Sequence, residues 1–140
     1  MYKRQALEVV DKCGLLGAKP SDIPIEENHR LALVAGPLLD YASRYRQLVG
    51  RLIYLTITRP DLCYAVHILS QFMQAPRQEH MAAASKVLRY IKGSPDCCIL
   101  LHTDADLQLA AFCDSNWGAC PITRQSLTGY LVTHKGSPIS

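Results

Sequence analysis

Asp114 is the acidic residue of this sequence best placed to do chemistry. It ends a predicted apolar strand, and Asn116 and Trp117 follow it. Such a carboxylate can contribute to a magnesium site, but Mg²⁺ prefers six oxygen ligands and gives up its water reluctantly. The sequence has no Asp-Asp pair. Asp114 alone therefore predicts weak metal binding at most, and a turn residue that caps backbone amides is the alternative. We expect Trp117 to be a packing residue rather than a stacking platform for bases.

The cysteine and histidine residues do not have the spacing of a metal site. No C-x-x-C pair is present, and no two histidines stand four residues apart on one predicted helix. Structural zinc sites need such short spacings to close a tetrahedron of ligands. We therefore expect free thiols in a reducing compartment and no zinc site.

Basic residues on two predicted helices are the candidate contacts to nucleic acid. Contacts to phosphate groups need positive charge and helical register but little sequence specificity. The formal net charge is only +3, well short of a dedicated nucleic-acid binder, and a solvated helix face would look the same. The candidates are Arg44, Arg51, Lys86, Arg89 and Lys92. Arg59 stands apart from them, because a local role, pairing with Asp61 or capping a helix end, is favoured there.

Hydrophobic periodicity predicts helices first and strands second. Apolar residues at helical spacing predict helices over 3–13, 43–58, 60–73 and 78–92, with a long loop over 15–40. Alternating segments predict strands over 97–101, 107–113 and 127–133 and a last one from Pro138, with hairpin turns at 103–106 and 135–136. The apolar stripe of the second helix comprises Tyr45, Leu48, Val49, Leu52, Ile53 and Leu55. This order predicts an α+β chain with two regions, 1–95 and 96–140.

The ends and apolar runs of the chain indicate no membrane segment. The first ten residues lack the continuous apolar stretch of a secretory signal, and acidic residues there argue against a transit peptide. No run approaches the roughly 20 apolar residues of a membrane span. We expect a soluble, intracellular protein without a membrane partner, with cytoplasm, nucleus and mitochondrion left open.

Three blocks of sequence resemble the copia-type LTR retrotransposon Pol polyprotein. The first is YRQLVGRLIYLTITRPD at 45–61, with SQFM at 70–73. The second runs from HM at 80–81 to VLRYIKGSP at 87–95, and the third joins DSNWG at 114–118 to RQSLTGY at 124–130. Upstream, ALEVV at 6–10 and GLLGAKP at 14–20 are also similar, so the resemblance covers nearly the whole chain. Copia-derived uncharacterised plant mitochondrial proteins are similar in the same way.

The resemblance implies a fold and a divided function. Residues 1–95 would be a small helical bundle like the thumb or connection of reverse transcriptase, and residues 96–140 an incomplete antiparallel ribonuclease-H-like sheet. The parent polyprotein performs RNA-directed DNA synthesis and RNA:DNA hybrid cleavage with Mg²⁺. Asp114 matches its first ribonuclease H carboxylate, whereas Asn116 stands where the family commonly has a second aspartate. The polymerase acids would lie upstream, and the other nuclease acids beyond Ser140, so we expect a fragment that is inactive alone.

Alternatives to the inactive fragment remain open. The helices could retain weak, salt-dependent affinity for an RNA:DNA duplex, or the chain could be one part of an active reverse transcriptase and ribonuclease H. It could also be a relic without a cellular role. The expected partners are nucleic-acid backbone and the remainder of the polyprotein. An uncovered apolar sheet face would also favour self-association.

Overall fold

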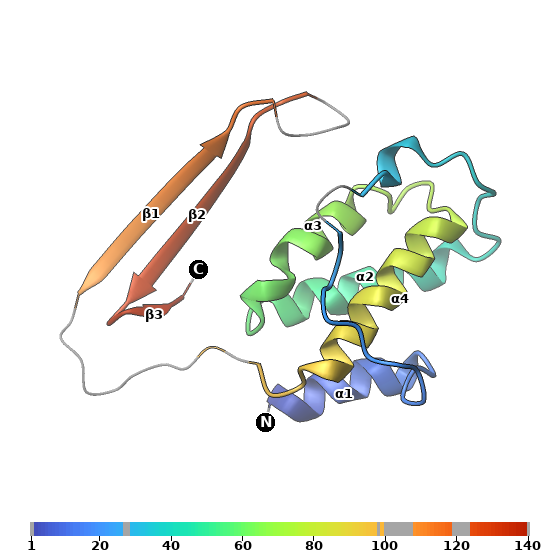
Figure 1. Cartoon of the computed structure of the whole chain (residues 1–140), viewed down its shortest axis with the longest axis horizontal. Helices are drawn as coiled ribbons and strands as arrows, with labels where there is room; N and C mark the ends of the chain where they lie inside the picture. Colours follow the sequence, from blue (N-terminus) through green and yellow to red (C-terminus); the bar gives the residue numbers. More distant parts are fainter. Residues whose placement is uncertain (1, 27–28, 98, 100–107, 119–123, 140) are drawn as a thin grey trace. The chain divides into compact units, whose positions relative to one another are not determined.

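The computed structural model describes residues 2–26, 29–97, 99, 108–118 and 124–139 (Figure 1). These residues belong to two compact units, Met1–Cys98 and Ile99–Ser140. The first, the helical unit, contains all the described helices, and the second, the sheet unit, contains the described strands. The predicted α+β class is confirmed. The division lies three residues beyond the predicted boundary at 95–96.

Among its described residues, the helical unit has four α-helices and two short 3₁₀ turns. The helices are α1 (Tyr2–Lys12), α2 (Ala42–Thr56), α3 (Cys63–Ser70) and α4 (Gln78–Gly93), and the 3₁₀ turns are η1 (Leu31–Leu33) and η2 (Pro60–Leu62). Three of the predicted helices are confirmed to within two residues at each end. The predicted helix over 60–73 is shorter than expected, because it opens as η2 and ends at Ser70. Proline at the first position of η2 suits this start, since it offers no backbone donor.

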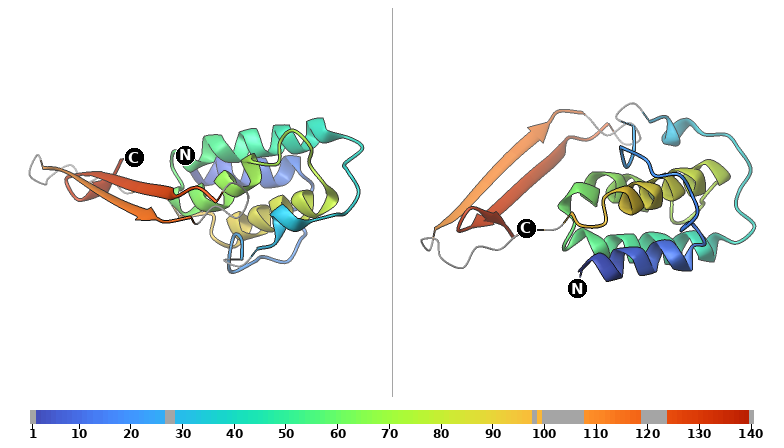
Figure 2. Two further views of the ribbon diagram at one scale, coloured as in Figure 1. Left: turned by 90° about the horizontal axis from the view of Figure 1, so that it is seen from above. Right: turned by 60° about the horizontal axis from the view of Figure 1, so that its bottom comes forward.

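The core of the helical unit lies between the four helices. α1 packs against α4, and α2 packs against α3. Figure 2 shows the helices of this unit from two further sides. The predicted stripe of α2 is buried except for Ile53, which is exposed because it lies about 100° round the helix from Leu52. The fully buried larger side chains are Val10, Tyr45, Val49, Leu52, Leu62, Ile68, Leu69, Val87, Leu88 and Ile91.

The polar groups of Tyr45 and His80 are buried in this core and are hydrogen-bonded. The hydroxyl of Tyr45 donates to the carbonyl oxygen of Leu69 at 2.8 Å, and burial raises the pKa of Tyr45 well above its usual range. Nδ1 of His80 accepts from the backbone N–H of Arg77 at 3.0 Å. The ring proton therefore sits on Nε2, which lies 3.1 Å from the carbonyl oxygen of Leu31 and donates to it. The ring of His80 also stacks on Phe72 at 4.0 Å between centroids.

The predicted loop over 15–40 is confirmed, with η1 as its one short helical turn among the described residues. Its first part, drawn in blue in Figure 1, crosses α4. The backbone N–H of Ser21 donates to the carbonyl oxygen of Arg89 at 3.2 Å. Further along, an isolated β-bridge joins Leu38 to Arg77 just ahead of α4. The loop is thus held to the helix at several points.

In the described part of the sheet unit, three strands pair antiparallel in the order β1 (Leu109–Asn116), β2 (Leu127–His134) and β3 (Ser137–Pro138). The predicted turn at 135–136 is confirmed. Lys135 and Gly136 both have positive φ, 53° and 73°, as a type I′ hairpin turn requires. The strand predicted over 107–113 is displaced, because β1 continues to Asn116. Asp114 is therefore inside a strand and not at its end, which is a correction to the sequence prediction.

Part of the predicted sheet lies outside the described residues. This holds for the turn at 103–106 and for most of the strand predicted over 97–101, whose described members Cys97 and Ile99 are not in a strand. No helix in the described part of the chain is long and apolar enough to cross a membrane.

Candidate nucleic-acid interface

A groove on the helical unit brings together three basic side chains from two helices. It has a volume of about 520 Å³ and lies between the end of α1, the outer side of α2 and one side of α4. We call it the basic groove. Its lining residues are Lys12, Cys13, Leu15, Arg44, Gln47, Leu48, Arg51, Met81, Ser85 and Leu88.

The spacing of residues along α2 places its charges in this groove. Arg44, Gln47 and Arg51 recur at three- and four-residue steps, so they lie on one side of the helix. Lys12 comes from the last turn of α1, where a cation complements the helix dipole. None of the described lining residues carries a carboxylate. The basic groove is therefore a region of positive potential with an apolar floor, which suits an anionic ligand.

Two further contacts describe the electrostatics of the basic groove. The guanidinium of Arg44 lies over the ring of Tyr41, 5.2 Å from its centroid. Burial raises the pKa of the Cys13 thiol, and the positive charge of Arg51 partly opposes this by favouring the thiolate. The charge of Arg51 thus reaches Cys13 across the basic groove, and it would attract a bound anion in the same way.

A second hollow of about 420 Å³ continues from the basic groove between α1 and α2. The two share Lys12, Gln47 and Arg51. Gly50 stands between Gln47 and Arg51 in the sequence. A β-carbon at this position would meet no atom within 4 Å, so the surface of α2 is open at this point. Glu8 lines this second hollow, which is therefore less positive than the basic groove.

The predicted basic residues of α4 have different surroundings. Nζ of Lys86 lies 2.9 Å from Oε1 of Glu26, and Nζ of Lys92 donates to the carbonyl oxygen of Ala18 at 2.7 Å. Arg89 is half-buried. Of the five predicted contacts, Arg44 and Arg51 line one groove, while Lys86 and Lys92 hold the loop. Sequence reasoning missed Lys12, although its place in the last turn of a predicted helix was a usable signal.

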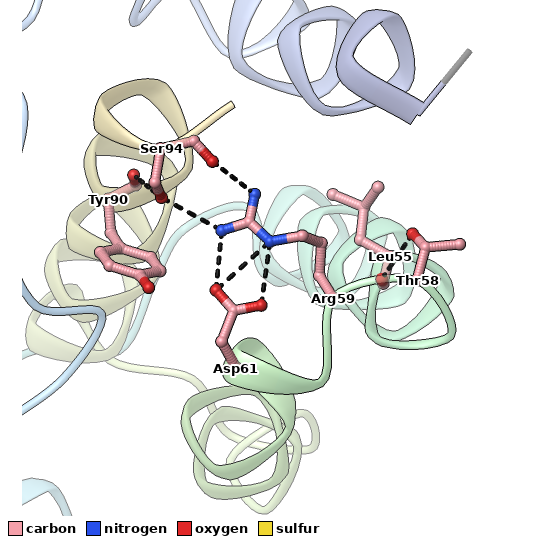
Figure 3. A network of polar contacts seen from close by, with 6 residues as sticks. All are labelled: Leu55, Thr58, Arg59, Asp61, Tyr90 and Ser94. Atoms are coloured by element: carbon pink, nitrogen blue, oxygen red, sulfur yellow. Dashed lines mark hydrogen bonds and ion pairs between the residues drawn. The ribbon is translucent and has the colours of Figure 1, made fainter. Parts of the chain in front are cut away.

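Arg59 has the local role that its sequence neighbours favoured (Figure 3). It is only 2% exposed, so its side chain is not available for contact with nucleic acid. Its Nη2 and Nε donate to the carboxylate of Asp61 at 2.7 and 2.9 Å. Its Nη1 and Nη2 donate to the carbonyl and hydroxyl oxygens of Ser94 at 2.8 and 3.1 Å. The prediction that Arg59 pairs with Asp61 is confirmed.

Asp114 is exposed on β1, directly opposite Gly129 of β2. Phe112 and Leu131 form the next pair on the same face of the two strands, and both are exposed. Among the described residues, no group of three or more His, Cys, Asp or Glu side chains could hold a metal ion. Trp117 is 95% exposed, so the prediction that it packs is wrong for this sheet unit. The described part of the unit contains no helix against which the ring could pack.

Comparison with curated proteins identifies relatives along nearly the whole chain. The chain is 38% identical over 138 residues to the retrovirus-related Pol polyprotein from transposon RE1 of Arabidopsis thaliana, covering 99% of this chain and 9% of that protein. It is 31% identical to the corresponding polyprotein from transposon TNT 1-94 of Nicotiana tabacum, over 94% of this chain and 10% of the relative. The chain thus spans about a tenth of the length of these polyproteins.

A shorter relative is matched over most of its own length. It is an uncharacterised mitochondrial protein of Arabidopsis thaliana, 53% identical over 78 residues, which are 56% of this chain and 70% of that protein. No family model matches the sequence, and no solved structure is significantly similar to it.

Proposed function

Because the chain belongs to the retrovirus-related Pol polyproteins of copia-type transposons, we propose that it serves such a polyprotein as a non-catalytic segment that contacts nucleic-acid backbone. In this proposal the helical unit corresponds to the end of the reverse transcriptase and the sheet unit to the start of ribonuclease H. The ligand is the phosphate backbone of an RNA:DNA hybrid.

The basic groove is the observation that carries the proposal. Three cations from α1 and α2 line it, without a carboxylate among its described lining residues. Backbone binding releases counterions, and log K for B-form DNA falls with log salt at a slope of about −0.9 for each phosphate neutralised. Lys12, Arg44 and Arg51 together would therefore contribute a slope of roughly −2 to −3.

A salt series with a matched pair of variants tests this. Fluorescence anisotropy would follow a labelled RNA:DNA hybrid as it binds the full chain. We expect Arg51→Gln to weaken binding and to make the slope shallower by about one. Arg30→Gln removes the same charge from an exposed residue that does not line the groove, and it should change neither quantity appreciably. Equal effects of the two variants would refute a localised interface.

We also propose that the chain alone does not cleave RNA, and Asp114 is the residue on which this can be tested. Two-metal cleavage of a phosphodiester takes several carboxylates around ions about 4 Å apart. No such set is present among the residues that the structure describes, and we assign no catalytic step to this chain. Incubation with an RNA:DNA hybrid and Mg²⁺ should give no cleavage. Cleavage that Asp114→Asn abolishes would refute the proposal and favour the alternative that the chain forms part of an active nuclease site.

A further inference from the structure

We propose that residues 18–26 form a strap that masks the basic side of α4 from nucleic acid. The inference rests on the proposed function for its ligand but on a different surface, since the basic groove lies mainly on α1 and α2. It also gives a role to the predicted contacts Lys86 and Lys92, which in this structure face protein groups.

The strap occupies the lysines of α4 in two ways. Glu26 supplies a carboxylate to Lys86 at 2.9 Å, and the hydrogen bond and charge of Lys86 lower the pKa of Glu26. Ala18 supplies its carbonyl oxygen to Lys92 at 2.7 Å. A phosphate oxygen is the same kind of acceptor as either of these groups. Strap and nucleic-acid backbone would therefore compete for the same donors.

Backbone contacts seat the strap between these two lysines. The N–H of Ser21 donates to the carbonyl oxygen of Arg89 at 3.2 Å. At the last turn of α4, a β-carbon built on Gly93 would lie 3.2 Å from Cβ of Pro20 and 3.5 Å from the carbonyl oxygen of Ser21. The strap thus rests directly on the helix at its C-terminal end.

The ion pair that attaches the strap to α4 is accessible to solvent. The side chain of Glu26 is 70% exposed and that of Lys86 is 24% exposed, so salt screens their attraction. A duplex presents many phosphates at once and can replace a single carboxylate. Release of the strap would add α4 to the interface.

A double-mutant cycle in the full chain tests the strap with an RNA:DNA hybrid as the probe. We expect Glu26→Gln to free Lys86, to steepen the salt slope by about one and to raise affinity roughly fivefold near 0.1 M salt. The gain should vanish in the Lys86→Gln background. Asp22→Asn is the matched control, because it removes the same charge from the strap but leaves the ion pair in place. Equal gains from Glu26→Gln and Asp22→Asn would overturn the strap.

Hydrogen exchange provides a second readout. If the hybrid displaces the strap, the amide of Ser21 should exchange faster when the hybrid is bound, and unchanged or slower exchange would overturn the proposal. Failure of the strap and failure of the proposed function are distinguishable. Binding that weakens in Arg51→Gln without a gain in Glu26→Gln refutes the strap alone. A gain in Glu26→Gln without an effect of Arg51→Gln refutes the basic groove alone, and no binding by any variant refutes both.

Discussion

Nη1 of Arg59 donates a hydrogen bond to the carbonyl oxygen of Ser94 at 2.8 Å, joining the segment between α2 and η2 to the C-terminal end of α4 across 35 residues of sequence. The guanidinium thereby satisfies a carbonyl at a helix C-terminus, where the helix dipole favours a cation. Asp61 neutralises the same guanidinium from the start of η2. One side chain thus connects three elements of the helical unit.

Loss of Arg59 should destabilise the helical unit strongly. The side chain is 3% exposed, and Arg59→Ala removes the guanidinium that neutralises Asp61 and donates to the carbonyl of Ser94. Breaking a buried ion pair costs about 3–5 kcal/mol, and because Asp61 is partly exposed we expect about 3 kcal/mol. Urea unfolding monitored by circular dichroism would measure it. Arg30→Ala, at an exposed site, should change the free energy of unfolding by less than about 0.5 kcal/mol.

The same pair should make stability fall in acid. Burial acts to raise the pKa of Asp61, but the hydrogen bonds and charge of Arg59, together with hydrogen bonds from Tyr90 and the backbone, hold that pKa below its usual value. A carboxyl with a lowered folded-state pKa stabilises above its unfolded pKa, about 3.9, and this contribution is lost as pH falls through the folded-state pKa. We expect the difference between the wild type and Asp61→Asn in free energy of unfolding to shrink below about pH 4. A difference that stays constant from pH 7 to pH 3 would contradict this assignment.

Tyr45→Phe should destabilise the core despite its conservative size. The substitution removes the hydroxyl that donates to Leu69 and leaves that buried carbonyl oxygen without this donor. The carbonyl keeps a hydrogen bond from the backbone N–H of Phe72 at 3.2 Å, so we expect the cost of one hydrogen bond, about 0.5–1.5 kcal/mol, whereas Tyr54→Phe removes an exposed hydroxyl and should be nearly neutral. Thermal unfolding of both variants under one set of conditions compares them. Equal melting temperatures would show that the Tyr45 hydroxyl contributes nothing.

Self-association through the sheet unit is the remaining prediction. Phe112 and Leu131 are neighbours on one face of β1 and β2, and both are exposed. Exposed apolar patches often mark sites of protein–protein interaction. We expect the wild type to form dimers or larger species at high concentration and the double variant Phe112→Thr, Leu131→Thr to do so less. Sedimentation velocity over a concentration series would measure this. Ile53→Thr changes an exposed apolar residue of the helical unit and serves as the control.

Local sequence patterns predicted the elements well where one local rule decides the structure. Helical periodicity placed α2 and α4, and Lys135-Gly136 marked a hairpin because the turn needs two residues with positive φ. The length of β1 was harder, because cross-strand pairing with Leu127 and Thr128 extends it to Asn116 and no local signal encodes that partner. The prediction that Ile53 belongs to the buried stripe of α2 was wrong for a related reason. An apolar residue at the margin of such a stripe can face either the core or the solvent.

The sequence pointed to the basic residues of the helices as candidates, but it did not show which of them lie together. Arg44 and Arg51 are seven residues apart on one helix, so their common face follows from helical geometry alone. The pairing of Lys86 with Glu26 spans 60 residues and depends on how the loop crosses α4, which no local pattern records. Arg59 could be assigned because its partner, Asp61, is only two residues away.

The ring of His80 offers a reporter that the chain carries by itself. Its Nε2 proton is directed at the carbonyl oxygen of Leu31, 49 residues earlier in the sequence, while Nδ1 holds the first turn of α4. The resonance of this one imidazole nitrogen therefore reports whether η1, in the loop over 15–40, is docked against His80. Spectroscopists can follow that docking in solution without attaching any label to the protein.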